Sequence, residues 1–352
     1  MRYLPTSRLT PGMALGQDIY DGAGRLLLGR HILLTEEQIS NLEFLGFPGA
    51  YVDDEFSRGI EIQQIVSPEV RRQALKIVYD LFHMDMRKQE PSEAELKLRK
   101  TVESVVDDVI CNGDIMCNIM DIKSYDDYIY YHSIHVGILS VVVGARLGLS
   151  HDKLCQLAAA ALLHDIGKRF IDHDIVRGGK AHRSEKEQEV YRSHPKIGAE
   201  YLRETCRFPA DVYEGIMEHH ECYNGEGYPL GKKGGGIHLF ARIIRIADCY
   251  DAKVSTFPAQ KSLSPSEALE YVMALGDRWF DPDIVAVFAR KVAAYPIGCE
   301  VELSNGQHAV VARNFENFPL RPLVRVVETG EMLNMRDDEK ARAVTVGRLI
   351  VR

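Results

Sequence analysis

Residues 219–229 read HHECYNGEGYP, so two adjacent histidines precede a glycine-rich loop. Neutral imidazole is a common ligand of transition metals, and a buried histidine pair costs free energy unless both rings find polar partners. Gly225 and Gly227 loosen the backbone of the loop that follows. What His219 and His220 do therefore depends on which other residues of the chain meet them.

Three His-Asp dipeptides occur in the chain, and their sequence context separates them. Ser150 precedes His151-Asp152, so we expect a capped helix over 151–163 with Asp152 in its first turn. His173-Asp174 lies in a polar stretch that we expect to be a loop. In contrast, His164-Asp165 ends the apolar segment LAAAALLHDIGK. Helical spacing puts His164 on one apolar face with Leu157, Ala160 and Ala161.

Four other segments direct a histidine or an aspartate toward an apolar helix face. They are His132 with Val136, Leu139 and Val143 in 130–147, His194 at a helix start before Pro195, His219 and His220 with Val212 and Ile216 in 209–221, and Asp248 after Ile244 in 241–252. A single buried histidine is most often a satisfied core residue. Five histidines and two aspartates directed inward are difficult to satisfy by hydrogen bonds alone.

Metal coordination would satisfy these seven side chains together, because imidazole and carboxylate suit Fe, Mn or Zn. Seven ligands are too many for one ion and enough for two. Consecutive residues of a helix project about 100° apart, so we expect His219 and His220 to serve neighbouring ions. Asp165 is the candidate to bridge the two ions.

Composition excludes several classes of function. The 352-residue chain has a net charge of −8, which disfavours sequence-independent binding to duplex nucleic acid. A small anionic ligand stays possible where positive charge is concentrated locally. The seven scattered cysteines form no CxxC pair and predict free thiols in a reducing cytoplasm. The first residues, MRYLPTSRLTPG, predict no signal peptide, and we expect Ile134–Leu149 to be a core helix too short to span a membrane.

The patterns predict a mainly α fold with a small unit at each end. Residues 1–58 read as an α/β module with strands in ALGQDIY and RLLLG around a DGAG turn, a helix capped by Thr35 and ending near Gly46, and a returning strand at 50–52. Residues 59–124 read as linker and packing helices with a break at Pro91-Ser92, and 125–295 as a helical domain. Residues 296–352 read as a β unit in which CEVEL, QHAVVARN and LVRVVET alternate and Asn305-Gly306 forms a hairpin turn.

Residues 126–293 resemble the HD-GYP family of bacterial cyclic-di-GMP phosphodiesterases, a branch of the HD metal-dependent phosphohydrolases. The matching pieces are YHSIHV, LLHDIGK, HPKIG, HHECYNGEGYP and ARIIRIADCYDA. Each piece alone is weak, but five in this order in a helical context are specific, and they cover about half the chain. The two terminal units resemble common neighbours of this domain much less specifically.

The resemblance implies a set of site residues. The implied metal ligands are His132, His164, Asp165, His194, His219, His220 and Asp248. Asp165 and Lys168 would be catalytic, and Gly227 and Tyr228 would line the nucleotide site, where the glycine would let backbone approach a guanine or a phosphate. The implied reaction is two-metal hydrolysis, in which an activated hydroxide attacks phosphorus in line and yields linear pGpG and, in a further step, GMP. Donor types favour Fe or Mn over Zn or Ni.

Two positions depart from the family pattern. Some members carry an acidic residue, which helps to hold a third metal, where this chain has Tyr128, so we expect two metals, with Asp126 or Asp127 as a weak substitute. The family's phosphate-binding Arg and Lys are replaced by Phe257 and Gln260. Compensating charge would come from Lys261 and from two basic loops, Arg177–Arg183 with Lys180 and His182, and Lys232-Lys233, so that Lys261, Arg183 and Lys232 are candidate substrate-binding residues.

Three alternatives to the phosphodiesterase remain. The chain could bind metals and sense a cyclic dinucleotide without turnover, or it could hydrolyse a different cyclic dinucleotide. It could also act on another phosphoester, although the intact GYP loop argues against that function. We expect Cys222 and Cys249 to be small core residues, and Asp251 to orient its neighbours rather than bind metal. Signalling proteins and a second copy of the chain are candidate partners, in the cytoplasm.

Overall fold

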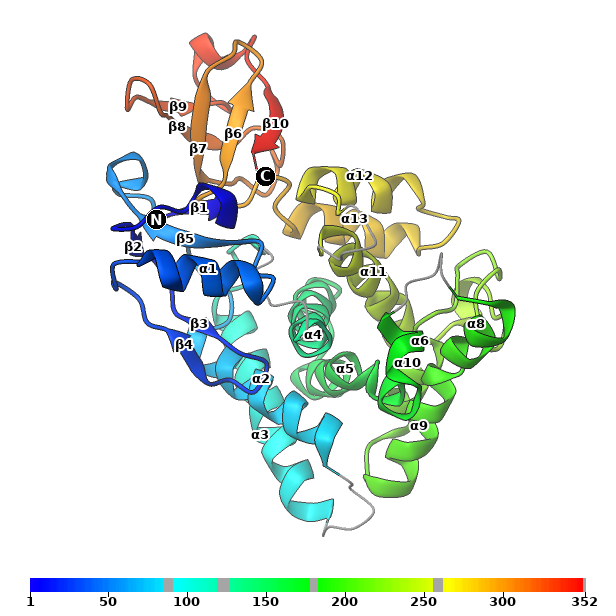
Figure 1. The fold of residues 1–352 in the computed structure, drawn as a ribbon. Coiled ribbons are helices and arrows are strands. Elements are labelled where there is room, and N and C mark those ends of the chain that lie inside the picture. Colours follow the sequence, from blue (N-terminus) through cyan, green and yellow to red (C-terminus); the bar gives the residue numbers. More distant parts are fainter. Residues whose placement is uncertain (85–90, 119–126, 178–182, 256–261, 351–352) are drawn as a thin grey trace.

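The computed structural model describes residues 1–84, 91–118, 127–177, 183–255 and 262–350. Helices dominate it, and two small sheet-containing units lie beside one another at one end (Figure 1). The predicted mainly α fold with a small unit at each end is confirmed. The boundaries drawn between these units stay predictions.

The N-terminal unit is an antiparallel sheet, ordered β1-β5-β2, with one helix and a separate hairpin. Its elements are β1 (Arg2–Pro5), η1 (Thr6–Arg8), β2 (Ala14–Leu15), β3 (Ile19–Tyr20), β4 (Leu26–Leu28), α1 (Glu36–Phe44), β5 (Gly49–Asp53) and η2 (Glu55–Ser57). The predicted capping box at Thr35 is present, because its hydroxyl accepts from Gln38 N and the Gln38 side chain accepts from Thr35 N. The single strand predicted in ALGQDIY is divided into β2 and β3, since β2 pairs with β5 whereas β3 pairs with β4.

The C-terminal unit is a five-stranded antiparallel sheet in the order β10-β6-β7-β8-β9. Its elements are β6 (Glu300–Leu303), β7 (His308–Arg313), β8 (Leu323–Val326), β9 (Met332–Asn334), η5 (Glu339–Ala341) and β10 (Val346–Ile350). The predicted hairpin at Asn305-Gly306 joins β6 and β7, and Gly306 adopts the left-handed φ of +82° that such a turn favours. The sequence patterns missed β9 and β10, which are short and lack clear alternation.

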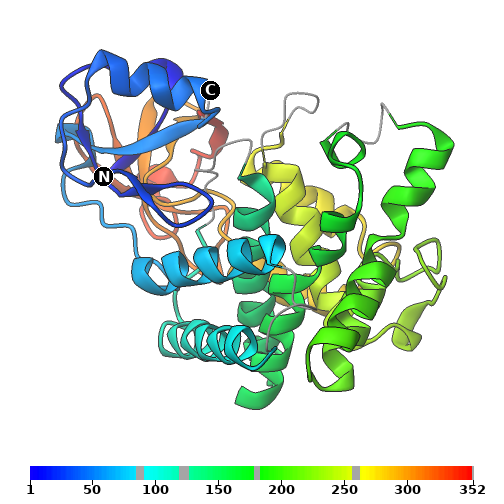
Figure 2. The ribbon, with the colours of Figure 1, turned by 60° about the horizontal axis from the view of Figure 1, so that its bottom comes forward.

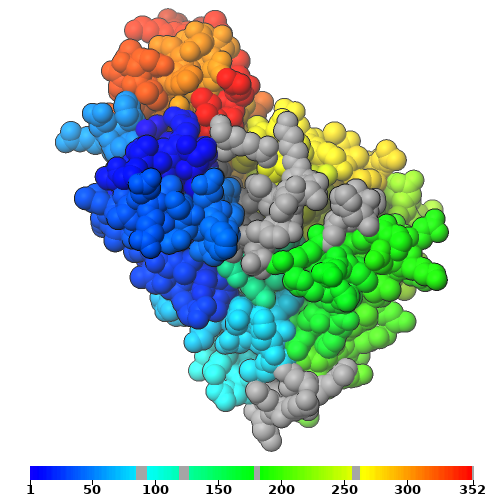
Figure 3. All heavy atoms as spheres, in the orientation of Figure 1, coloured from blue at the N-terminus to red at the C-terminus, as the bar shows by residue number. Residues whose placement is uncertain are grey.

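The two terminal units contact one another through a buried charge. Glu300 of β6 is 3% exposed and pairs with Arg2 of β1 at 3.2 Å and with Arg8 at 3.0 Å. Figure 3 shows the surfaces of the two units adjoining. Residues far apart in the sequence therefore form one end of the molecule.

The rest of the molecule consists of the packing helices and the helical core. The elements are α2 (Pro68–His83), α3 (Pro91–Cys111), α4 (Tyr128–Arg146), α5 (His151–Leu163), η3 (Ile166–Phe170), α6 (His173–Arg177), α8 (Glu185–Arg192), α9 (His194–Thr205), α10 (Ala210–Glu218), η4 (Gly234–Gly236), α11 (Leu239–Val254), α12 (Pro265–Ala274) and α13 (Pro282–Lys291). Figure 2 shows α2 and α3 side by side against this core. One apolar cluster extends from these helices into β6, β7 and β8.

The predicted break at Pro91-Ser92 coincides with a helix start, because Pro91 begins α3 and the first position of a helix needs no backbone N–H. Two details differ from the expectations. His173-Asp174 lies in the short helix α6 instead of a loop, although both side chains are exposed. The expected core helix runs from Tyr128 to Arg146, and its 19 residues are long and apolar enough to cross a membrane, so the expectation from length was wrong. Its role as a core helix is nevertheless clear, because 72% of its apolar window is buried inside the protein.

Gly167 allows η3 to approach α9 at backbone distance. A Cβ atom placed on Gly167 would lie 2.0 Å from His194 O and 2.8 Å from Gly198 N. Both neighbours are backbone atoms, so a side chain could not be accommodated by a rotamer change. The close approach brings the HDIGK segment against the first turn of α9.

We predict that Gly167→Ala destabilises the protein by roughly 1–3 kcal/mol, because the added methyl group must force η3 and α9 apart. Thermal unfolding of wild type and variant measures the effect. Gly235→Ala is the matched control, since a Cβ there meets nothing within 4 Å. Equal melting temperatures for Gly167→Ala and wild type would contradict the prediction.

Candidate metal centre

The seven predicted ligands converge on one buried cluster. Asp165, His194, His219 and His220 form one group, and His132, His164 and Asp165 form a second, with the ligand atoms of each group within 4.8 Å of one another. Asp165 belongs to both groups. Asp248 joins the cluster, because its Oδ1 lies 3.2 Å from His132 Nε2 and 4.0 Å from His164 Nε2, while its Oδ2 lies 3.9 Å from His220 Nδ1.

Helix ends and helix faces position these side chains. His164 caps the C-terminus of α5, His219 caps that of α10, and His194 is the first residue of α9. His132 and Asp248 project from within α4 and α11, which pack against one another. Each of these helices buries apolar residues on the same side, so core packing fixes where the polar side chains meet.

The Nδ1 atom of three histidines is held by the backbone carbonyl three residues earlier. His164 Nδ1 lies 2.8 Å from Ala161 O, His194 Nδ1 lies 2.7 Å from Tyr191 O, and His219 Nδ1 lies 2.6 Å from Ile216 O. A carbonyl can only accept, so Nδ1 carries the proton in each ring. Each Nε2 is then left with a lone pair facing the cluster, as a metal ligand requires.

A carboxylate holds His132 in the same way. Asp251 Oδ2 lies 2.7 Å from His132 Nδ1, and Asp251 Oδ1 lies 2.8 Å from His135 Nδ1. Asp251 thus orients its neighbours, as predicted, and belongs to neither group of candidate ligands. The role of His135 as the second partner of Asp251 was missed, although its position one helical turn after His132 was a usable signal.

The cluster fits a bound cation better than it fits mutual hydrogen bonding. His194 Nε2 lies 3.3 Å from His219 Nε2, and because both rings carry a proton on Nδ1, their Nε2 lone pairs repel unless a proton or a cation lies between them. His164 Nε2 is fully buried and has no hydrogen-bond partner in the part of the chain that the structure describes. Asp165 Oδ1 lies 3.2 Å from His194 Nε2 without the alignment of a hydrogen bond. Ligands of a shared ion are expected to lie close together without hydrogen-bond alignment to one another, as these atoms do.

The protonation states suit a metal site. Burial lowers the pKa of His219 and His220 well below the usual value, and the neighbouring imidazoles lower both further. Burial alone would raise the pKa of Asp165, but Lys168, His164 and His194 outweigh it and hold that pKa well below the usual range. His219 and His220 are therefore neutral, and Asp165 is ionised, near neutral pH. Together with the match of this region to the HD domain family, these imidazole and carboxylate donors indicate binding of divalent metal.

His219 and His220 differ from the expectation in one respect. Helix α10 ends at Glu218, so the projection of consecutive helical residues does not apply to them. Both rings lie in the group with Asp165 and His194 rather than one in each group. The turn after α10 brings the ring centroids within 4.2 Å of one another.

Lys168 lies against the cluster. Its Nζ is 2.5 Å from Asp165 Oδ2, and its side chain is 11% exposed. Burial disfavours the ammonium form, but Asp165 and then Tyr191 outweigh that penalty and raise the pKa of Lys168 above its usual value. A permanent positive charge thus stands beside the carboxylate that both groups share.

The glycine-rich loop is held by two buried carboxylates. Glu221 accepts from Leu230 N at 2.6 Å, and Glu218 accepts from His238 N at 2.8 Å and from Lys232 Nζ at 2.5 Å. Lys232, a predicted substrate-binding residue, is thus engaged in holding the loop. This explains in part how the GYP segment keeps its place beside the cluster.

Gly227 and Tyr228 show how the loop meets the cluster. A Cβ on Gly227 would lie 2.2 Å from Cys222 N, so this glycine permits close packing within the loop, whereas the expected reason was approach to a ligand. The Tyr228 ring stacks on His220 with centroids 4.8 Å apart. Arg183 stacks on Tyr191 at 3.6 Å and donates to Ile175 O and Val176 O.

Other predicted positions are placed as follows. The hydroxyl of Tyr128 lies 3.2 Å from His132 Nδ1, and Asp127 at the start of α4 belongs to neither ligand group. Cys222 and Cys249 are buried, and burial raises the pKa of Cys249 to about 11, as suits a small core residue. Arg177 and Lys233 are exposed. The predictions on Asp126, Lys180, His182, Phe257, Gln260 and Lys261 concern residues outside the described ranges.

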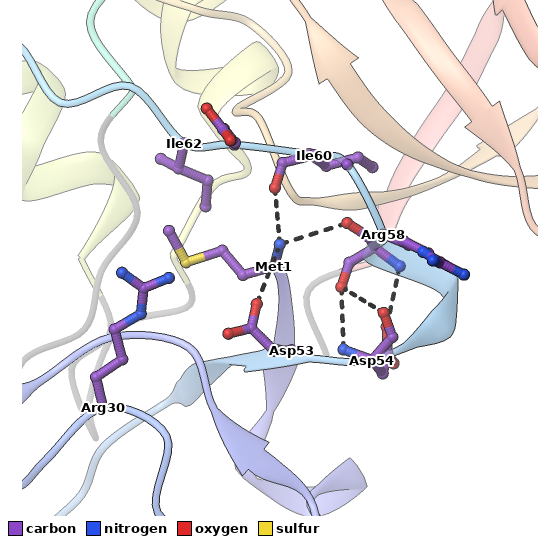
Figure 4. Close-up of a pocket in the computed structure, with 10 residues that line it drawn as sticks. Met1, Arg30, Asp53, Asp54, Arg58, Ile60 and Ile62 are labelled. Carbon is purple, nitrogen blue, oxygen red and sulfur yellow. Dashed lines mark hydrogen bonds and ion pairs between the residues drawn. The ribbon is translucent and has the colours of Figure 1, made fainter.

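A separate cavity of about 660 Å³ lies in the N-terminal unit. Figure 4 shows the amino group of Met1 there, bound to Ile60 O at 2.8 Å and close to Asp53. None of the predicted site residues lines this cavity. The chemistry-bearing residues therefore lie elsewhere.

The comparison with protein families agrees with the geometry of the cluster. The model of the family described as "HD domain" matches residues 118–284, which contain all seven predicted ligands. Residues 118–284 thus match the HD domain family, the family of metal-dependent phosphohydrolases that the sequence motifs resemble.

Two curated relatives and one solved structure resemble this chain. PA4108 of Pseudomonas aeruginosa, named a cyclic di-GMP phosphodiesterase, is 32% identical over 226 residues, which are 64% of this chain and 54% of PA4108. RpfG of Xanthomonas campestris, named a cyclic di-GMP phosphodiesterase response regulator, is 38% identical over 151 residues, 42% of this chain and 39% of RpfG. The chain thus spans about half the length of the curated relatives it matches. Bd1817, an HDG"Y"P protein from Bdellovibrio bacteriovorus, covers 82% of this chain and 97% of its own with a TM-score of 0.51 and 18% identity, a likeness of fold alone.

We predict that Asp251→Asn weakens metal binding roughly 10- to 100-fold, because the amide cannot accept both Nδ1–H groups. Metal titration of chelator-treated protein measures the loss. Asp174→Asn is the control, since Asp174 is fully exposed. Unchanged affinity in Asp251→Asn would show that His132 does not need this carboxylate.

We also predict a pH-dependent stability of the metal-free protein. Burial disfavours charged His132, but the hydrogen bonds that the ring donates to Asp248 and Asp251 outweigh it and raise the pKa of His132 from 6.5 to about 9. Protonated His132 therefore stabilises the fold fully below pH 6.5, and that stabilisation is lost as the pH rises through about 9. Urea unfolding in chelator should show the advantage of wild type over His132→Gln shrinking by on the order of 3 kcal/mol between pH 6 and pH 10. A constant or growing advantage would contradict this sign.

Proposed function

We propose that this protein is a divalent-metal-dependent phosphodiesterase that opens cyclic di-GMP to linear pGpG and can proceed to GMP. The observation that carries the proposal is the convergence of five histidines and two aspartates in two groups that share Asp165. The curated relatives named as cyclic di-GMP phosphodiesterases support it. The GYP loop beside His220 supports a nucleotide substrate rather than a simple phosphoester.

Two divalent ions, iron or manganese, are the proposed cofactors. His194, His219 and His220 would hold one ion, His132, His164 and Asp248 the other, and Asp165 would contact both. The presence of two groups, and imidazole and carboxylate as the only donors in them, support this assignment. When bound, such ions supply Lewis-acid charge and an activated water. Tyr128 occupies the position where some HD-GYP proteins have an acidic residue that helps to hold a third metal, and this supports two ions rather than three.

The chain's own residues would position the phosphodiester and stabilise its charge. The Lys168 ammonium lies beside Asp165, where negative charge grows on the non-bridging phosphoryl oxygens during attack. A water oxygen forms the new bond to phosphorus and the bond to O3′ breaks, so the product carries a 5′-phosphate and a free 3′-hydroxyl. The water's proton balances the leaving alkoxide.

Two of the predicted substrate-binding residues, Tyr228 and Arg183, are linked to the cluster histidines through aromatic contacts. Tyr228 stacks on His220, and Arg183 stacks on Tyr191, whose carbonyl holds His194. Gly227 and Lys232 would act by shaping the loop. All seven cysteines are free, which supports a cytoplasmic location, and the two terminal units would provide surfaces for a signalling partner or a second copy.

The deciding experiment combines metal content and turnover in one preparation purified without chelator. We predict about two metals per chain and conversion of cyclic di-GMP to pGpG, with turnover reduced at least ~10³-fold in Asp165→Ala, because both groups lose their shared ligand. Elemental analysis and chromatography measure the two quantities. Asp174→Ala serves as the control for an exposed aspartate.

Metal-loaded wild type that binds labelled cyclic di-GMP without forming product would refute the phosphodiesterase and favour a sensor. Product formation that survives in Asp165→Ala would refute the assigned site.

A further inference from the structure

Arg192 ends α8 and projects over the GYP loop. Its guanidinium carbon lies 5.4 Å from the centroid of the Tyr228 ring, and the residue is exposed. Tyr228 in turn stacks on His220 of the candidate metal cluster. One aromatic ring thus connects an exposed cation to a candidate metal ligand.

Arg192 differs from the other basic groups around the cluster in having no polar partner. Within the described ranges, no hydrogen bond or ion pair involves its guanidinium, and the residue is exposed. Lys168 is paired with Asp165, and Arg183 donates to two backbone carbonyls. Arg245 lies within 3.7 Å of Asp248. Arg192 is the basic group among these whose donors are available to an incoming anion.

The chemistry of the substrate supplies a reason for such a group. A cyclic dinucleotide carries two phosphodiesters, and only one can lie at the metal cluster during hydrolysis. The second stays anionic beside a protein whose net charge is −8. A guanidinium presents two parallel N–H donors, which match two phosphate oxygens, and a neighbouring aromatic ring attracts its charge.

We propose that Arg192, supported by Tyr228, binds the phosphate of the cyclic dinucleotide that is not being cleaved. This inference rests on the proposed function and adds a substrate-binding residue to it. Arg192 then contributes to substrate affinity and to the choice of a two-phosphate substrate, and it takes no part in the bond-breaking step.

The test compares Arg192→Gln with wild type on two substrates. Cyclic di-GMP has the second phosphate, whereas bis(p-nitrophenyl) phosphate has only the phosphodiester that is cleaved. We expect KM for cyclic di-GMP to rise about tenfold or more, with kcat within about threefold, because a charge-assisted bidentate contact is lost. For bis(p-nitrophenyl) phosphate, kcat/KM should stay within about twofold of wild type.

Arg203→Gln is the matched control. Arg203 of α9 is also exposed, and its guanidinium carbon lies 5.2 Å from the centroid of the Tyr213 ring, which does not contact the cluster histidines within the described residues. Its kinetics on both substrates should equal those of wild type. Arg192→Lys keeps the charge without the fork, so its KM for cyclic di-GMP should fall between those of Arg192→Gln and wild type.

An unchanged KM for cyclic di-GMP in Arg192→Gln, in a protein that cleaves this substrate, would overturn the inference and leave the proposed function intact. Equal losses on both substrates would overturn it as well, because they would indicate a structural role. Wild type that cleaves bis(p-nitrophenyl) phosphate but not cyclic di-GMP would overturn the proposed function itself.

Discussion

The site depends on one repeated interaction, in which an oxygen accepts the Nδ1–H of a buried histidine. Backbone carbonyls serve His164, His194 and His219, and Asp251 serves His132. The interaction fixes the tautomer and the ring plane together, so four Nε2 atoms face one volume. Three of the acceptors are backbone carbonyls that lie three residues before their own histidine. Their placement therefore follows from backbone geometry and not from side-chain packing.

The same arrangement makes the cluster costly without an ion. Desolvated imidazole lone pairs and carboxylates lie close together, and the ammonium group of Lys168, whose side chain is 11% exposed, offsets part of the negative charge. Burial of unpaired polar groups costs free energy, which the apolar packing of α4, α5 and α11 must offset. An ion that binds the folded state would therefore stabilise the protein as well as equip the site.

The N-terminal unit reaches the site through the first turns of α4. Tyr131, next to His132, donates to Tyr20 O of β3 at 2.8 Å. Gly22, in the turn after β3, packs so closely on Asp127 and Tyr130 that a Cβ there would lie within 2.8 Å of both side chains. A unit without evident chemistry of its own thus touches the helix that carries a candidate ligand.

The sequence predicted the main helices, the candidate ligand residues and Asp165 as the residue that the two groups share. Apolar stripes predicted that His132 and Asp248 lie on buried helix faces, and both residues are buried. This was predictable because helical periodicity is a local property of the sequence. The sequence did not reveal that α10 ends before His219, so His219 and His220 were expected to serve different ions. In the fold, both lie in one group of candidate ligands. Local patterns also missed β9 and β10, because their pairing depends on strands elsewhere in the chain.

The tertiary structure alone decided which groups hold the ligands and which remain available. Asp251 meets His132 and His135 only because α11 packs on α4, and Glu218 and Glu221 meet the loop only after it folds back on α10. Arg192 and Tyr228 are far apart in sequence and become neighbours through the packing of α8 beside the loop. Such contacts join residues with no shared local pattern, so their geometry depends on the packing of whole elements and is fixed only when the chain folds.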